Sequence, residues 1–429
     1  MGQSIRTFSG GTIPIAILTA IVALSAAPAA ARPGDLDPSF DGDGIATTSV
    51  GGMGGAPYAV AVQDDGKVIL AGTTGPVDGA FALVRFEADG TLDASFGGDG
   101  KVITRFPTPA TAEDVEIVHG NLIVVGTTGF SEDARIVVAR YRTDGALDRT
   151  FASDGRLIIR FKGGAYASDM AVQSNGKIVV AGEQLHPDGS RFAVARLTPD
   201  GVLDRAFGRD GKVSTAIHGR HSAASAVGVT RRGVLAVGWM VPHRASRLAV
   251  VRYTFRGRLD PSFSGDGVLS RSLHGGPRWD TVGQSLVFDD EGRAIIGAYV
   301  DDPAYYASSA VLLRLRPAGD VDGTFAGDGV SRAPMEAASA VRVQDDGKIV
   351  VAGGICCGGG DETTYVVARF LPGGRLDPEF GIDGIAFADF PSSAHDVPLS
   401  DMTLQEDGRI VAGGVASYSE GFLAVRLLA

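Results

Sequence analysis

The chain has 429 residues, of which 61 are glycine and 20 are proline; 44% are hydrophobic and 21% are charged. This composition excludes disordered and fibrous chains and predicts a folded protein. The formal net charge of −11 disfavours nucleic acids and anionic lipid surfaces as partners, because both are bound through clustered Lys and Arg side chains.

The first element along the chain is a predicted secretory signal peptide, residues 1–31. Arg6 is its only charged residue, an apolar run extends over residues 13–24, and small residues follow in SAAPAAARP. We expect cleavage after Ala31 or after Ala29. An uncleaved membrane anchor is the alternative, but the apolar run of 12 residues is shorter than the ~20 needed to span a bilayer. We therefore expect residues 32–429 to be a secreted, extracellular domain without a membrane span.

A motif of the form Leu-Asp-x-x-Phe then recurs through the rest of the chain. Its seven copies begin at Leu36, Leu92, Leu147, Leu203, Leu259, Val321 and Leu376, at intervals of 55, 56 or 62 residues. A period this regular predicts a repeat architecture rather than several unrelated domains.

Each repeat unit contains three apolar runs, which in the first unit are residues 58–62, 67–72 and 81–86. Short runs of Val, Ile, Leu and Phe punctuated by Asp-Gly are typical of strands joined by tight hairpins. The runs VILA and ALV are apolar at consecutive positions, so both faces of each sheet should be covered. The sequence therefore predicts an all-β fold, a seven-bladed β-propeller of four-stranded blades. A β-helix has much shorter coils, and a string of separate sandwiches would need about seven strands in each domain.

The third run of every unit carries an arginine, and after the last of these, Arg426, the chain ends without another Leu-Asp motif. Seven arginine strands are therefore matched by seven motifs only if the N-terminal copy serves the last unit. We predict that residues 36–48 supply the outer strand of the blade formed by residues 402–429 and so close the ring, which leaves no unpaired edge. In a rival phasing, residues 45–48 are the inner strand of their own blade and no ends are shared.

Two recurring sets of aspartates allow two interpretations. A calcium site is one, since Asp41-Gly-Asp43-Gly resembles half of a calcium loop, but only the last Asp of this element recurs, which leaves too few of the usual six to eight oxygen ligands. The other is structural, with one Asp of each motif paired with the preceding arginine. We favour the structural network and expect no metal or other cofactor. The network comprises Arg85, Arg140, Arg196, Arg252, Arg314, Arg369, Arg426, Asp37, Asp93, Asp148, Asp204, Asp260, Asp322 and Asp377.

The units resemble the bacterial delta-60 repeat family. The resemblance rests on VAVQDDGKVILAG with FALVRFEADGTLDASFGGDG (residues 60–100) and on VRVQDDGKIVVAGG with VVARFLPGGRLDPEFGIDG (residues 341–384). It covers nearly all of the chain after residue 31, and the strand plan is also similar to that of NHL-type propellers. The resemblance implies an extracellular propeller and brings no catalytic residue to this chain.

The fourth and fifth units depart from the pattern, with VTRRGVLAVGW in one and VDGTF with a longer loop in the other. Non-repeated His and aromatic residues gather in these two units, which suggests loops that stack on a sugar ring or contact a protein. The pair in HGRH could also be read as metal ligands, but an i, i+3 spacing on a strand or loop does not hold both rings on one side. The candidate ligand-binding residues are His218, His221, Trp239, His243, Trp279, Tyr305 and Tyr306.

No linear catalytic motif is present, so the favoured function is a non-enzymatic, monomeric propeller that binds or scaffolds an extracellular protein or polysaccharide. The alternative is a hydrolase or lyase whose acids and His line the central channel, with or without a metal. Acids from different blades converging in the channel would favour catalysis, and small apolar residues there would favour binding through loops. The adjacent Cys356 and Cys357 could form a strained disulfide or remain thiols.

Overall fold

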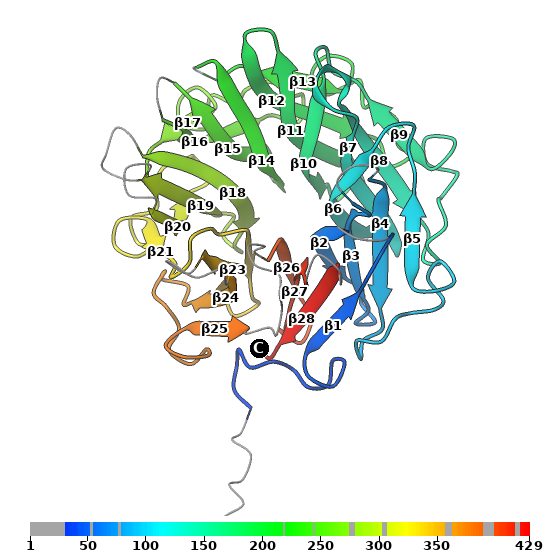
Figure 1. Ribbon diagram of the computed structural model, residues 1–429. Helices are drawn as coiled ribbons and strands as arrows, with labels where there is room; N and C mark the ends of the chain where they lie inside the picture. Colours follow the sequence, from blue (N-terminus) through cyan, green and yellow to red (C-terminus); the bar gives the residue numbers. More distant parts are fainter. Residues whose placement is uncertain are drawn as a thin grey trace, which may run out of the picture. The chain divides into compact units, whose positions relative to one another are not determined.

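The computed structural model describes residues 31–429 except 52–54, 76–78, 218, 243–244, 274–278, 303–306, 357–362, 389–398 and 417–420. Residues 1–30, and with them most of the predicted signal peptide, lie outside the described residues. Residues 32–429 form one compact unit. In its described part, 28 strands form seven four-stranded antiparallel sheets around a ring (Figure 1), which confirms the all-β, seven-bladed prediction.

The strands of each blade follow one another outwards from the centre of the ring. The innermost strands are β2 (Ala56–Val62), β6 (Ala110–Val118), β10 (Ala165–Val172), β14 (His221–Thr230), β18 (Asp280–Phe288), β22 (Ala340–Val343) and β26 (Asp401–Leu404). The second strands are β3 (Val68–Thr73), β7 (Asn121–Thr128), β11 (Ile178–His186), β15 (Gly233–Val241), β19 (Ala294–Asp302), β23 (Ile349–Cys356) and β27 (Ile410–Val415).

The two outer layers complete the blades. The third strands are β4 (Phe81–Phe86), β8 (Arg135–Tyr141), β12 (Gly189–Leu197), β16 (Arg247–Tyr253), β20 (Ala307–Leu315), β24 (Thr363–Phe370) and β28 (Phe422–Leu427). The outermost strands are β5 (Lys101–Thr104), β9 (Arg156–Ile159), β13 (Lys212–Thr215), β17 (Val268–Arg271), β21 (Val330–Arg332), β25 (Ile385–Ala388) and β1 (Ile45–Thr48). A single-turn 3-10 helix, η1 (Ser131–Asp133), precedes β8. Blades 1 to 6 run from β2–β5 to β22–β25, and blade 7 consists of β26, β27, β28 and β1.

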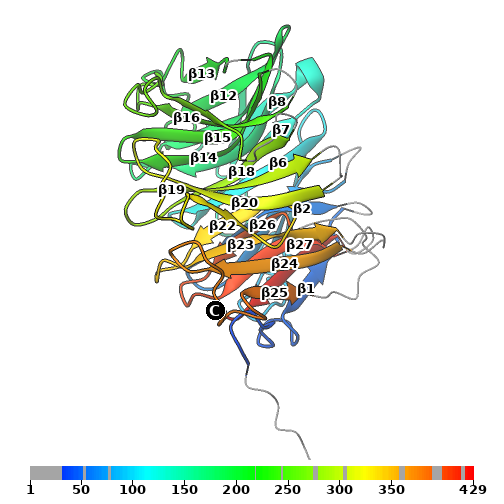
Figure 2. The same cartoon turned by 90° about the vertical axis from the view of Figure 1, so that its left-hand side faces the viewer.

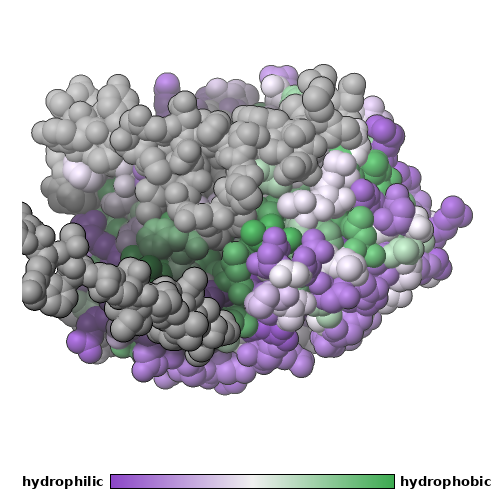
Figure 3. All heavy atoms as spheres, turned by 60° about the horizontal axis from the view of Figure 1, so that its bottom comes forward, coloured by the Kyte–Doolittle hydropathy of each residue, from purple (hydrophilic) through white to green (hydrophobic). Residues whose placement is uncertain are grey.

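The hydrophobic core lies between neighbouring blades. Every residue of β3 and β4 is buried, as expected from runs that are apolar at consecutive positions. One core cluster joins Phe81 and Leu83 of blade 1 to Val124 and Val137 of blade 2. The side view in Figure 2 shows the successive blades that make these contacts, and Figure 3 shows hydrophilic residues along the outer edge with hydrophobic residues in the recessed part of that view.

The two ends of the propeller meet in blade 7. Strand β1 pairs with β28 from Ile45 opposite Val425 to Thr48 opposite Phe422, and the two strands lie side by side in Figure 1 (blue and red). The prediction that the N-terminal copy completes the last blade is confirmed, and the rival phasing is wrong. The Leu-Asp-x-x-Phe motif itself forms a bridge and a turn rather than the start of the strand, because Leu36 bridges Leu427 and regular pairing begins only at Ile45.

The N-terminal segment also replaces a turn that the last unit lacks. In blade 1, Gly97 N–H donates to Asp144 C=O, which lies in the turn after the third strand of blade 2 (3.0 Å). Blade 6 makes the same contact from Gly381 N–H to Pro33 C=O (2.7 Å). Residues 33–48 therefore supply both the missing turn and the missing strand of blade 7.

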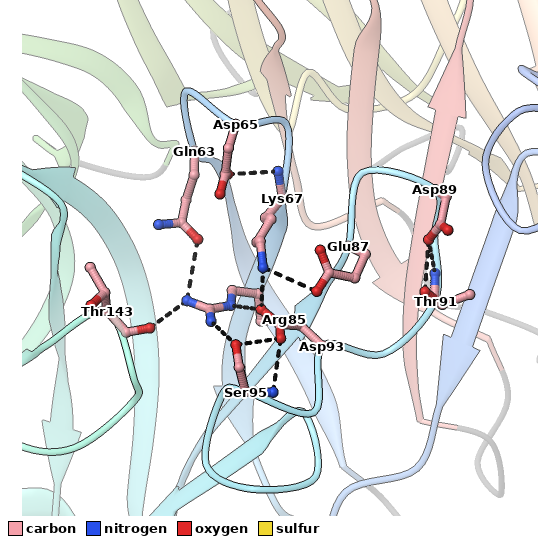
Figure 4. A network of polar contacts seen from close by, with 10 residues as sticks. All are labelled: Gln63, Asp65, Lys67, Arg85, Glu87, Asp89, Thr91, Asp93, Ser95 and Thr143. Carbon is pink, nitrogen blue, oxygen red and sulfur yellow. Dashed lines mark hydrogen bonds and ion pairs between the residues drawn. The ribbon is translucent and has the colours of Figure 1, made fainter.

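A buried arginine organises the outer half of each blade, as shown for blade 1 in Figure 4. Arg85 Nε lies 2.6 Å from Asp93 Oδ2, and the two side chains are 5% and 2% exposed. Asp93 Oδ1 accepts the backbone N–H of Ser95 (2.9 Å), and the guanidinium lies 4.6 Å from the centroid of the Phe96 ring. Arg85 Nη1 donates to the C=O of Thr143 in blade 2.

The ion pair and the ring contact, which we call the clasp, are present in all seven blades, and in five of them the arginine also donates to a C=O of the next blade. The distances from Nε to Oδ2 lie between 2.6 and 2.9 Å, and those from the guanidinium carbon to the ring centroid between 4.6 and 5.0 Å. In six blades the Asp follows the Arg by eight residues, whereas in blade 7 Arg426 pairs with Asp37. The clasps are Arg85–Asp93–Phe96, Arg140–Asp148–Phe151, Arg196–Asp204–Phe207, Arg252–Asp260–Phe263, Arg314–Asp322–Phe325, Arg369–Asp377–Phe380 and Arg426–Asp37–Phe40.

The second set of aspartates serves the turns that lead into the outermost strands. In five blades the Oδ1 atom accepts the backbone N–H two residues later, at distances of 2.9 to 3.1 Å. The acceptors are Asp43, Asp99, Asp154, Asp266 and Asp328. These contacts support a structural role for the DGDG-like elements.

Removing the N-terminal segment should destabilise the whole ring. A chain that begins at Ser49 lacks β1 and leaves the edge of β28 and the contacts of the buried Phe40 and Ala46 unfilled. We expect a lower melting temperature and aggregation relative to a chain that begins at Arg32, measured by scanning calorimetry and light scattering. Identical melting of the two chains would contradict the closure.

The clasps should also set the acid limit of stability. Burial alone would raise the pKa of Asp37, but hydrogen bonds from Ser39 and Arg409 and the charge of Arg426 outweigh it and lower the pKa to about 2. The pKa of Asp322 is likewise lowered to about 2, since hydrogen bonds from Thr324 and the charge of Arg314 outweigh burial. A lowered pKa stabilises the folded state above about pH 4, and this stabilisation is lost as the pH falls towards 2.

The variant Asp93→Asn tests this account in a single blade. It leaves Arg85 buried without a counter-ion, which costs about 3 kcal/mol or more of unfolding free energy. Denaturant unfolding at pH 7 and pH 3 should show a large loss at pH 7 and a smaller one at pH 3. Asp64 is an exposed turn residue, so Asp64→Asn is the matched control. It should leave the unfolding free energy unchanged at both pH 7 and pH 3.

Candidate functional site: the central channel

The innermost strands of all seven blades enclose a cavity of about 580 Å³ at the centre of the ring. Each blade contributes one residue at a corresponding position: Tyr58, Glu113, Ser168, Ser225, Gln284, Ser339 and Ser400. In blades 1 to 5 this residue is the extra one of a β-bulge, as where the register of β6 shifts between Ala112 and Asp114. Bulges re-aim side chains, and here they present a different residue from each blade to the channel.

Three aspartates next to these positions connect neighbouring innermost strands. Asp114 Oδ2 of blade 2 accepts Met170 N–H of blade 3 (3.0 Å), and Asp169 Oδ2 of blade 3 accepts Val227 N–H of blade 4 (2.6 Å). In blade 7, Asp401 Oδ2 accepts Val60 N–H of blade 1 (3.1 Å). These carboxylates therefore fasten adjacent blades at the channel wall.

Two glutamates and one arginine add charge to the same wall. Arg342 of blade 6 donates from Nη2 to Asp401 Oδ1 (3.0 Å). Glu113 and Glu116 of blade 2 are partly accessible from the cavity, although protein surrounds the channel on all sides. Carboxylates from blades 2, 3 and 7 thus converge on one space beside a single guanidinium.

Burial shifts the titration of these acids towards neutral pH. It raises the pKa of Glu113 to about 7, and together with the charge of Asp114 it raises the pKa of Glu116 to about 8. Burial and the neighbouring Asp401 carboxylate raise the pKa of Asp114 to about 6. Burial and the neighbouring Asp114 carboxylate also raise the pKa of Asp169.

The loop residues proposed from the sequence do not line this channel where the structure describes them. His221 is exposed at the start of β14, Trp239 is partly buried in β15, and Trp279 packs against the core cluster between blades 4 and 5. His221 and Trp239 lie on the same face of the β14–β15 pair, because Ala223 is opposite Trp239 and His221 is opposite Val241. His218, His243, Tyr305 and Tyr306 lie outside the described residues. Cys356 is the last residue of β23. Cys357 lies outside the described residues.

Sequence reasoning missed the channel acids, although the signal was present. The second unit reads AEDVEI where the first reads PYAVAV, so three acids stand where the first unit has Tyr58, Ala59 and Ala61. Residues that differ between repeats mark function more often than shared residues do, and this rule applies to strands as well as to loops.

Among the described residues, no helix is long and apolar enough to cross a membrane.

The raised pKa values of the glutamates predict an alkaline loss of stability. A carboxyl whose pKa is raised from 4.5 to about 7 or 8 binds its proton more tightly in the folded state, so stability falls as the pH rises through that range. Glu113→Gln and Glu116→Gln should raise the melting temperature by a few degrees at pH 9 and leave it unchanged at pH 5. Glu132→Gln, on the exposed helix η1, is the control; equal shifts in all three variants would contradict the assignment.

Comparisons with known proteins agree with a repeat propeller. Residues 63–96, 120–151, 173–207 and 344–380 match a family model described as a β-propeller domain of unknown function, DUF5122. No curated protein matches the chain.

Solved structures match the chain at low identity and with low TM-scores. They include Sqt1 from Chaetomium thermophilum (12% identity, TM-score 0.47, covering 89% of this chain and 98% of that one). A gluconolactonase from Xanthomonas campestris is 13% identical, with a TM-score of 0.35 and coverage of 76% and 99%. Scores this low carry no functional argument. The chain is a seven-bladed repeat propeller, and four of its units are similar to the DUF5122 β-propeller family.

Proposed function

We propose that this chain is an exported, non-enzymatic propeller of the delta-60 type that binds a positively charged extracellular ligand through its central channel. The observation that carries this proposal is the division between repeated and varied residues. Repeated residues build the clasps and the cores between blades, whereas varied residues surround the channel cavity with carboxylates.

The charge balance of the channel favours a cationic ligand. Five carboxyl groups, from Glu113, Asp114, Glu116, Asp169 and Asp401, face one guanidinium, Arg342. Low-dielectric walls strengthen the attraction of such a cluster for ammonium or guanidinium groups. Tyr58 at the same level offers an aromatic surface against which the apolar part of a ligand could pack.

Binding is favoured over catalysis because most of these acids already have structural partners. Asp114, Asp169 and Asp401 accept backbone N–H groups of the next blade, and the described channel wall contains no histidine. One observation supports a hydrolase or lyase as the second candidate: burial raises the pKa of Glu113 to about 7, close to the value suited to a general acid. Turnover of a polysaccharide panel that is abolished by Glu113→Gln would establish that second candidate.

Calorimetric titration with spermine tests the binding proposal. We expect saturable binding that tightens between pH 6 and pH 9, as Glu113 and Glu116 lose their protons, and weakens with added salt. The double variant Glu113→Gln/Glu116→Gln should weaken binding at pH 9 at least about tenfold, because each charged contact contributes about 1.5 kcal/mol or more.

The matched control removes two exposed acids, Glu132→Gln and Asp188→Asn, with the same change in net charge. This control should bind spermine as the unchanged protein does. Equal weakening in both double variants would show attraction to overall charge and would contradict a channel site.

A further inference from the structure

The turn between the first and second strands normally fills the space above each clasp. In five blades this turn has five residues, as in QDDGK of blade 1, and its last residue is a cation that reaches the clasp aspartate. Figure 4 shows Lys67 and Gln63 in this position over Arg85. The five cations are Lys67, Lys177, Arg293, Lys348 and Arg409.

Blade 4 has a turn that is one residue shorter. Val229 pairs with Val234, so only TRRG lies between them, compared with QDDGK between Val62 and Val68. The cation is missing and Thr230 takes the place of the glutamine. A pocket of about 410 Å³ occupies the vacated space beside Arg252 and Phe263.

Blade 2 has a turn of the same length as blade 4. Its turn is equally short, since Ile117 pairs with Leu122 around VHGN, and a pocket of about 330 Å³ lies beside its clasp residue Arg140. Both blades with a short turn therefore have a pocket beside the clasp arginine. Blade 3, whose turn has the full five residues, also has a pocket beside its clasp residue Arg196, but Lys177 lines that pocket. The blade 2 pocket is lined by polar residues such as His119 and Asn175, so the two pockets differ in chemistry.

The blade 4 pocket combines an apolar floor with a cationic rim. The floor consists of Leu235, Phe263 and Ala294, which are 2 to 4% exposed, together with the partly buried Phe288 of blade 5. Arg231 and Arg232 line the rim, are exposed, and form no ion pair within the described part of the chain.

Three acids lie on the opposite rim, and only Asp290 among them forms no ion pair within the described part of the chain, so the two arginines outnumber it. Asp289 and Glu291 are paired with Arg293 (2.7 and 2.6 Å). In the clasp beneath, Arg252 Nε lies 2.8 Å from Asp260 Oδ2, and the guanidinium also donates to Pro317 C=O and Ser262 Oγ. The pocket is therefore a cationic site on a protein whose net charge is −11.

We propose that the pocket between blades 4 and 5 binds a small aromatic carboxylate. The ring would lie against Phe288 and Phe263, and the carboxylate would accept hydrogen bonds from Arg231 or Arg232, which suit planar oxyanions. A volume of about 410 Å³ is within the range of small-molecule sites. This site is separate from the channel and does not depend on its function.

Calorimetric titration with 2-naphthoate tests the proposal, with 2-naphthalenemethanol and acetate as probes that lack the charge and the ring, respectively. We expect 2-naphthoate to bind at least about tenfold more tightly than either probe, since both parts of the pocket contribute. The variant Arg231→Ala/Arg232→Ala should weaken 2-naphthoate binding about tenfold or more and bring it close to that of the alcohol. Arg149→Ala/Arg205→Ala removes two exposed arginines outside the pocket and should leave binding unchanged.

A second variant closes the pocket without removing apolar surface. Replacing the segment TRRG of blade 4 by QDDGK of blade 1 restores the glutamine and the lysine over the clasp and should abolish 2-naphthoate binding while spermine binding in the channel persists. Absence of 2-naphthoate binding to the unchanged protein, or unaltered binding in the Arg231→Ala/Arg232→Ala variant, would overturn the proposal.

Discussion

A buried guanidinium must have a carboxylate partner, and this requirement determines how the propeller is built. Six of the seven clasp arginines are almost inaccessible to water, Arg140 being 16% exposed, and an unpaired buried charge would cost several kcal/mol. In six blades the partner comes from the segment that follows directly in the chain. Arg426 has no such segment, so its partner must come from the other end of the chain, and Asp37 supplies it.

In five blades the clasp arginine also links its blade to the next one. Besides the ion pair, Arg85 donates to Thr143 C=O of blade 2, and Arg426 donates to Ala88 C=O of blade 1. Closure is therefore part of a repeated contact rather than a special feature of one blade. At the channel wall, Asp401 makes a second link between blades 7 and 1 through Val60 N–H.

Clasp and channel acids respond to pH in opposite directions. The clasp aspartates have lowered pKa values because guanidinium and hydrogen bonds favour their charged form, so acid removes their contribution. Glu113 and Glu116 have raised pKa values because burial disfavours their charge, so base removes theirs. Together these effects place the greatest stability near pH 4 to 5, above the range in which the clasp aspartates lose their charge and below the range in which the channel glutamates favour the unfolded chain.

Much of the fold could be predicted because repetition exposes it. Counting arginine strands against Leu-Asp motifs gave the number of blades and the shared ends, and the consecutive apolar residues of VILA and ALV predicted sheets covered on both faces. The residues that line the channel could not be predicted. The spacing of the repeats does not show where a β-bulge, such as the one at Glu113, turns a side chain towards the centre of the ring. The short turn of blade 4 was visible in the sequence. Its pocket was not, because only the structure shows that Gln63 and Lys67 contact the clasp in blade 1 and that blade 4 lacks these two side chains.

Complementation in trans tests the central role of the clasp most directly. A chain that begins at Ser49 is mixed with a synthetic peptide of residues 32–48, and melting is followed by calorimetry. The account predicts that the peptide restores the melting temperature of the full propeller and that the same peptide with Asp37→Asn does not. Equal rescue by both peptides, or no need for either, would contradict the claim that Arg426 and Asp37 close the ring.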